Sequence, residues 1–183
     1  MPHEPRPVLR VSPTARIAVC GQAPGTRVHA SGTPFTDPSG VRLRAWMGVD
    51  DEEFYDVRRI AVIPMGFCFP GLDAKGADRP PRSECADHWH ARLFEQLPQL
   101  DLLLLVGAYA QRWHLPARRQ ASLSQTVADW QMIARAGPTR TFARVCAIPL
   151  PHPSWRNNAW LKARPWFERE LLPVLQAKVR ERI

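Results

Sequence analysis

Four short runs of apolar residues constrain most strongly how this chain can fold. They lie at residues 17–20 (IAVC), 59–65 (RIAVIPM), 101–106 (DLLLLV) and 144–150 (RVCAIPL). Strands that are apolar throughout, rather than at alternate positions, are typical of a parallel sheet buried on both faces. We therefore predict an α/β fold: a three-layer α/β/α sandwich with a central, mostly parallel four-stranded sheet.

Helices are expected between these runs. The pattern predicts helices over 41–47, 83–97 and 119–136, a turn near Phe54 capped by Asp50 or Asp51, and a helix from Gly107 towards His114. A C-terminal helix is expected to start at Pro165 and to bend at Pro173. Residues 1–15, rich in Pro and Arg and without periodicity, predict an N-terminal arm, and residues 16–183 predict one domain.

Charge and composition narrow the class of partner. The 183 residues carry a formal net charge of +8, which favours a polyanion such as nucleic acid. The first residues lack the apolar segment of a secretion signal, and the longest apolar stretch is too short to cross a bilayer. We expect a cytoplasmic monomer with no membrane partner. Cys20, Cys68, Cys85 and Cys146 include no CxxC pair, so we predict no disulfide framework and no metal site.

Three loops follow predicted strands and should meet at one edge of the sheet. They are 21–25 (GQAPG), 65–71 (MGFCFPG) and 151–157 (PHPSWRN). Ligands of open α/β sheets bind beyond the carboxyl ends of the strands, so a site is expected there. The two glycines around Pro24 allow the backbone to approach a ligand closely.

Individual residues of these loops, and of the loop at 32–40, suggest nucleobase chemistry. Phe35 stands on a polar, rigid loop, where base stacking would explain an aromatic ring, although an anchor in the core would also explain it. His152, between two prolines, could donate a hydrogen bond to an oxygen that becomes anionic as a bond breaks. Ser154 and Arg156 could meet a phosphate, and Trp155 is a candidate wedge or packing residue.

The motifs G-x-x-P-G at 21–25, G-x-P-F at 32–35 and H-P-S at 152–154 together resemble the signature loops of the uracil-DNA glycosylase superfamily. The chain is most similar to the branch whose thermophilic members carry an iron–sulfur cluster, from about Ile17 to the C-terminal helix. The resemblance implies hydrolysis of the N-glycosidic bond of uracil, or another deaminated base, flipped out of DNA. It implies catalytic roles for His152 and Gln22.

The same resemblance implies the roles of the remaining site residues. Substrate binding falls to Gly21, Ala23, Gly25, Phe35 and Gly66. DNA binding falls to Ser154, Trp155 and Arg156. If a general base exists, the ionisable residues near the first loop, His29 and Asp37, are the candidates.

Three departures from that branch carry consequences. Two of its four cluster cysteines have no counterpart here, so we expect no iron–sulfur cluster and no other cofactor. Gln22 replaces a glutamate, and a glutamine can orient a water but cannot accept its proton. Pro64 replaces the asparagine that reads the uracil edge in many relatives.

These departures leave three alternatives open. The first is a catalytically weak or non-enzymatic nucleic-acid-binding protein that keeps the pocket. The second is a glycosylase for another damaged base, such as hypoxanthine or xanthine. The third is a small-molecule hydrolase with Cys68 as its nucleophile, although the aromatic neighbours of that cysteine suggest a packed thiol.

Overall fold

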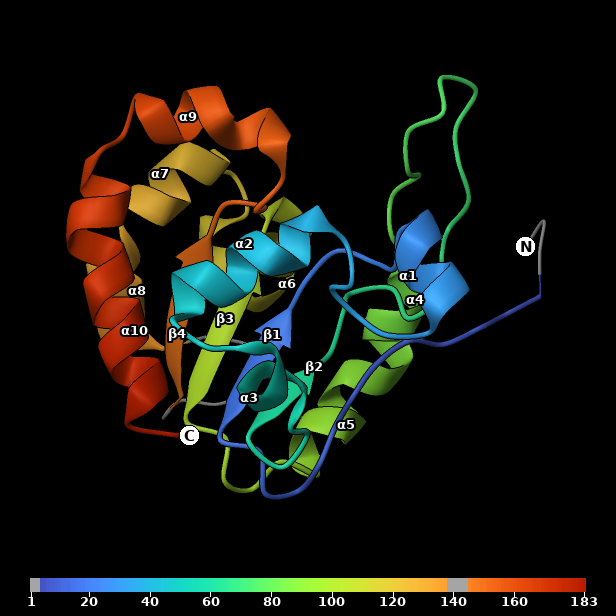
Figure 1. Ribbon diagram of the computed structural model, residues 1–183, viewed down its shortest axis with the longest axis horizontal. Coiled ribbons are helices and arrows are strands. Elements are labelled where there is room, and N and C mark those ends of the chain that lie inside the picture. Colours follow the sequence, from blue (N-terminus) through green and yellow to red (C-terminus); the bar gives the residue numbers. More distant parts are fainter. Residues whose placement is uncertain (1–3, 138–144) are drawn as a thin grey trace.

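The computed structural model describes residues 4–137 and 145–183 and confirms the predicted α/β sandwich (Figure 1). Four parallel strands form one sheet in the order β2-β1-β3-β4. The strands are β1 (Ile17–Cys20), β2 (Ile60–Val62), β3 (Leu102–Val106) and β4 (Cys146–Leu150). All four coincide with apolar runs of the sequence; residues 141–144, expected before β4, lie outside the described residues.

Helices cover both faces of the sheet because alternate strand residues point to opposite sides. One core joins Ile17, Val19 and Leu104 to side chains of α2, α3 and α10. The other joins Ala18, Cys20 and Leu103 to side chains of α5, α6 and α8. The helices are α1 (Thr26–Ser31), α2 (Pro38–Met47), α3 (Asp51–Tyr55), α4 (Ser83–Cys85), α5 (Ala91–Glu95), α6 (Ala108–His114), α7 (Leu123–Ala128), α8 (Trp130–Ala136), α9 (Asn158–Lys162) and α10 (Leu172–Arg180).

Several helices differ from their predicted bounds. The helix expected over 119–136 begins at Leu123, where Ser122 caps it, and is broken at Asp129 into α7 and α8. The helix expected over 83–97 forms, with a π-helical turn at Ala86–His90. Pro165 precedes the C-terminal helix rather than opening it. A π-helical turn at Phe167–Leu171 precedes Pro173, which lies in the first turn of α10, where its missing N–H is tolerated.

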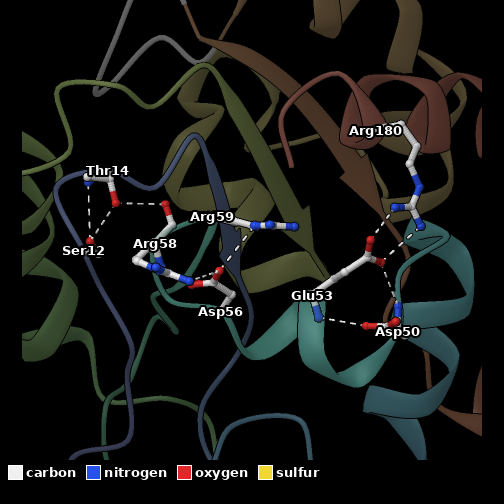
Figure 2. A network of polar contacts seen from close by, with 8 residues as sticks. All are labelled: Ser12, Thr14, Asp50, Glu53, Asp56, Arg58, Arg59 and Arg180. Carbon is white, nitrogen blue, oxygen red and sulfur yellow. Dashed lines mark hydrogen bonds and ion pairs between the residues drawn. The ribbon is translucent and has the colours of Figure 1, made fainter.

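The short helix α3 is fixed by polar contacts to its neighbours (Figure 2). Asp50 and Glu53 form a reciprocal capping box, as the sequence suggested for Asp50. Arg180 of α10 donates to the Glu53 carboxylate at 3.1 Å, and Asp56 pairs with the Arg58 and Arg59 guanidinium groups beyond the helix. This network holds α3, whose last residues support the candidate site.

The N-terminal segment is bonded to the edge of the sheet. The Val8 N–H donates to the Phe67 carbonyl at 2.7 Å, and Arg10 and Val62 exchange backbone hydrogen bonds as an antiparallel bridge. Val8 is buried. Residues 8–10 therefore cover the outer edge of β2, which would otherwise expose unpaired backbone groups. No helix within the described residues is long and apolar enough to cross a membrane.

One buried histidine makes stability depend on pH. The His90 ring packs against Phe67 and Phe94, and its Nε2–H donates to the Pro64 carbonyl at 3.0 Å. Burial lowers the pKa of His90 below its usual value, and the hydrogen bond to Pro64 opposes this shift. His90 is therefore neutral in the native state at neutral pH.

The free energy of unfolding should consequently fall as the pH drops below about 6.5, because the unfolded chain then binds a proton that native His90 does not. One such proton contributes up to about 1.4 kcal/mol per pH unit. We expect His90→Gln to flatten this dependence in urea titrations from neutral to mildly acidic pH. The control His88→Gln changes an exposed histidine of the same helical turn. An unchanged slope in His90→Gln would contradict this account.

Candidate functional site

Two connected cavities open at the carboxyl edge of the sheet. The outer groove, of about 660 Å³, and the inner pocket, of about 110 Å³, have eight lining residues in common. These are Gln22, Ala23, Gly25, Val28, Asp37, Ser39, Asp78 and His152. The loops after β1 and β4 thus meet at one site, as the sequence predicted, whereas no residue of the third predicted loop, at 65–71, lines either cavity.

Phe35 lines the inner pocket in a strained backbone conformation. Its φ is +57°, the only positive φ of a non-glycine residue among those described. The Phe35 carbonyl accepts hydrogen bonds from Arg44 at 3.1 Å and from the Tyr55 hydroxyl at 3.2 Å. Its ring meets Phe54 edge-on, with centroids 6.0 Å apart. The left-handed conformation costs about 1–2 kcal/mol, and these contacts from α2 and α3 offset it.

Two glycines make room for Phe35. A Cβ at Gly40 would lie 1.7 Å from the Phe35 carbonyl oxygen, so no other residue fits there without moving the loop. A Cβ at Gly21 would lie 3.3 Å from the Phe35 ring. Asp37, which lies between Phe35 and Gly40 in the sequence, is the N-cap of α2. Its side chain accepts a hydrogen bond from the Gly40 N–H at 3.2 Å. The GQAPG loop and the Phe35 loop are therefore packed as one unit.

His152 enters the site from the end of β4 with its backbone held on both sides. Buried Pro151 and Pro153 flank it, and its carbonyl accepts a hydrogen bond from Asn157 at 2.6 Å. Gly107, with φ +83°, lies behind it: a Cβ there would contact the His152 side chain at 3.7 Å. Burial lowers the pKa of His152, whereas Asp37 and Asp78 raise it. At neutral pH the imidazole is neutral and can donate a hydrogen bond.

Asp78 is a site residue that sequence reasoning missed. It lies on the hairpin at residues 71–79, which projects beside α1 (Figure 1), and it lines both cavities. Burial raises the pKa of its carboxyl, Arg156 and His152 lower it, and Asp37 raises it. In the sequence this aspartate is one of several acidic and basic residues in a long loop rich in Gly and Pro. Only the turn of the hairpin brings it to the sheet edge.

The mouth of the outer groove is basic and aromatic. Trp155 is 70% exposed, and the Arg156 guanidinium lies 5.2 Å from the centre of its ring. Arg42 of α2 donates to the Ser154 carbonyl at 3.1 Å and, with Arg27, lines the groove. Trp155 and Arg156 were predicted from the sequence, whereas Arg27 and Arg42 were not, because only tertiary packing brings these helical arginines to the groove.

Three other candidates lie outside the lining of both cavities. Gly66 donates its N–H to the Gln22 carbonyl at 2.9 Å and so supports the GQAPG loop from behind. His29 packs against the Phe69 ring, with centroids 5.6 Å apart. Burial raises the pKa of the half-buried Cys68 thiol, which disfavours the thiolate that a nucleophile needs. The structure gives the Cys68 hydrolase alternative no support.

No group of three or more His, Cys, Asp or Glu side chains is arranged to hold a metal ion in the part of the chain that the structure describes. The absence of a cofactor remains a prediction.

The fold is that of an α/β protein with a candidate site at the carboxyl edge of its parallel sheet. In this site a strained phenylalanine, a neutral histidine and two carboxylates lie beside a basic groove. The family model described as the uracil DNA glycosylase superfamily matches residues 10–176. The chain belongs to this superfamily.

A solved structure has the same fold. The solution NMR structure of a candidate uracil DNA glycosylase from Methanosarcina acetivorans is 16% identical in sequence and superimposes with a TM-score of 0.51. The match covers 91% of this chain and 92% of that one. At this identity the likeness concerns the fold, and the activity must be argued from the site.

The charges around His152 should be measurable in its titration. NMR of the imidazole should give a midpoint below about 6.5. Asp78→Asn should lower the midpoint further, because it removes a negative charge that stabilises the imidazolium, and Arg156→Gln should raise it. Asp87→Asn, on an exposed residue outside the cavity linings, serves as the control. A midpoint unmoved by both site variants would contradict the described arrangement.

Proposed function

We propose that this chain is a DNA glycosylase that hydrolyses the N-glycosidic bond of a flipped-out uracil or other deaminated base, as in base excision repair. The observation that carries the proposal is that Phe35 and His152 line the same narrow pocket, which opens into a basic groove. The inner pocket of about 110 Å³ has room for about four water molecules, which suits one flat heterocycle.

The residues of the inner pocket fit the demands of base release. Breaking the bond leaves a sugar with oxocarbenium character and a base that gains negative charge. Phe35 stacks on the extruded base, and neutral His152 donates a hydrogen bond to its anionic oxygen. Gln22, with the backbone of Gly21 and Ala23, reads the base edge or orients water. An apolar wall of Val8, Val62 and Pro64 closes the pocket.

The outer groove fits the DNA backbone on either side of the extruded nucleotide. Arg27, Arg42 and Arg156 supply positive charge, and Ser154 can donate to a phosphate. Exposed Trp155 can enter the space that the base leaves, so that flipping, which costs a few kcal/mol, is partly offset by stacking.

A second candidate is a nucleic-acid-binding protein that keeps the pocket with little or no catalysis. The observation that favours it is that Gln22, which lines both cavities, cannot accept a proton, whereas the resemblance to the iron–sulfur branch implies a glutamate there. The two candidates differ in one outcome, which is release of the base.

Base release from labelled oligonucleotides carrying uracil, hypoxanthine or xanthine, single- and double-stranded, tests the proposal. We expect release of at least one base, and we expect His152→Ala to slow it by about 10²–10³-fold, because one anion-stabilising donor is lost. The control His88→Ala, on an exposed helical residue, should act like the wild type.

No release from any substrate, together with salt-sensitive DNA binding, would contradict the enzyme and support the non-catalytic candidate. Release that His152→Ala leaves unchanged would contradict the role of His152.

A further inference from the structure

The hairpin at residues 71–79 places one carboxylate over the inner pocket. The Asp73 N–H donates to the Ala77 carbonyl at 2.8 Å, and the Arg79 N–H donates to the Gly71 carbonyl at 3.0 Å. The Asp73 side chain also accepts from the Lys75 and Ala77 N–H groups, which fixes the turn. Asp78 pairs with Leu72 across the hairpin, at the end nearest the site. Its position is thus set by backbone bonds.

The Asp78 carboxylate lies against the GQAPG loop. A Cβ at Gly25 would be 3.3 Å from its Oδ2 atom, so the glycine is what allows the approach. Three charged or titratable groups are close enough to affect the ionisation of Asp78. They are Asp37, the N-cap of α2, and His152 and Arg156, which follow β4. Arg27 of α1 and Arg42 of α2 complete the ionisable lining of the groove.

Other polar residues of the site are less suited to accept a proton. Asp37 accepts the Gly40 N–H as the N-cap of α2, and Gln22 has no basic group. His29 does not line either cavity. Asp78, by contrast, makes no hydrogen bond or ion pair with any other described residue. An unpaired carboxylate in a groove that binds phosphates weakens that binding, which calls for another role.

We propose that Asp78 is the proton acceptor for the water that attacks the sugar, an assignment that rests on the proposed glycosylase function. The water oxygen bonds to C1′ as the C1′–N bond breaks, and the electron pair of that bond goes to the base, whose oxygen His152 stabilises. The Asp78 carboxylate takes the proton of the water. That proton then passes to the released base or to solvent, so one water is consumed for each base and sugar formed.

The environment of Asp78 suits this role. Its partial burial raises the pKa of the carboxyl, which makes the carboxylate a stronger base than in free solution. Arg156 and His152 lower the pKa and so favour the ionised form that accepts a proton. The hairpin also forms part of the groove wall, since Leu72 and Ala77 line the same groove as Trp155 of the loop after β4.

Single-turnover base release by Asp78→Asn and Asp78→Ala, on the substrate that the wild type cleaves, tests the assignment. We expect a loss of about 10²–10⁴-fold, the usual contribution of a general base. Affinity for an oligonucleotide with the non-cleavable 2′-fluoro form of that nucleotide should be unchanged or tighter, because a negative charge has been removed. Asp87→Asn, the same charge change on an exposed residue outside the cavity linings, should have no effect on either quantity.

Azide distinguishes a lost proton acceptor from a disturbed pocket. Azide is already anionic, so it attacks C1′ without giving up a proton. It should raise the rate of Asp78→Ala and yield the glycosyl azide by mass spectrometry. It should leave His152→Ala slow, since that variant lacks leaving-group stabilisation.

The outcomes separate the two claims. A wild-type rate in Asp78→Asn, an equal loss of rate and affinity, or a slow Asp78→Ala that azide does not restore would each overturn the assignment alone. No base release by the wild type would overturn the proposed function, and this assignment with it.

Discussion

The site depends on the parallel register of β1 between β2 and β3. Val19 is paired with Val62 on one side and with Leu104 on the other, so the three strands end at nearly the same level. The strand residues are buried on both faces, and a slip by one position would move every apolar side chain to the opposite core. Because this register is fixed, the loops after β1 and β4 meet above the sheet without a dedicated contact between their strands.

A chain of contacts runs from α10 through α3 to the pocket. Arg180 and the capping box hold α3 (Figure 2). Helix α3 presents Phe54 and Tyr55 to the Phe35 loop. Arg44 pairs with Asp51 at 2.6 Å and also donates to the Phe35 carbonyl. A ring held in this way loses little freedom when a base stacks on it, which is the advantage of preorganisation. The strain at Phe35 is therefore compatible with a binding role.

Electrostatics divides the site into two parts. The outer groove carries the arginines and would attract a phosphate backbone. Within it, Asp37 and Asp78 lie near His152 and oppose the effect of burial on the pKa of that histidine. Burial outweighs them, so the imidazole stays neutral and remains a donor at neutral pH. This balance matters for leaving-group stabilisation, in which the neutral imidazole would donate a hydrogen bond to the base oxygen and keep its proton.

The strands and the edge of the site could be predicted because uniform apolar runs and Gly/Pro loops are local signals. Phe35 and His152 could be predicted for the same reason. The residues of GQAPG, GTPF and HPS carry the resemblance to the superfamily. Asp78, Arg42 and Val8 could not be predicted, because each reaches the site through pairing or packing with distant residues. Gly66, predicted to bind substrate, follows a strand but lies outside both cavity linings, where its N–H donates to the Gln22 carbonyl. Helix α1 lacks a side-chain cap, and this explains why it was missed.

We infer that the inner pocket receives a base turned out of the DNA. A crystal structure of His152→Ala with a duplex containing the cleaved nucleotide would test this most directly. The account predicts that the base lies on the Phe35 ring, with its edge at Gln22 and the flanking phosphates at Ser154 and Arg156. A bound duplex with that base still stacked in the helix, or an inner pocket closed off from the DNA, would contradict it.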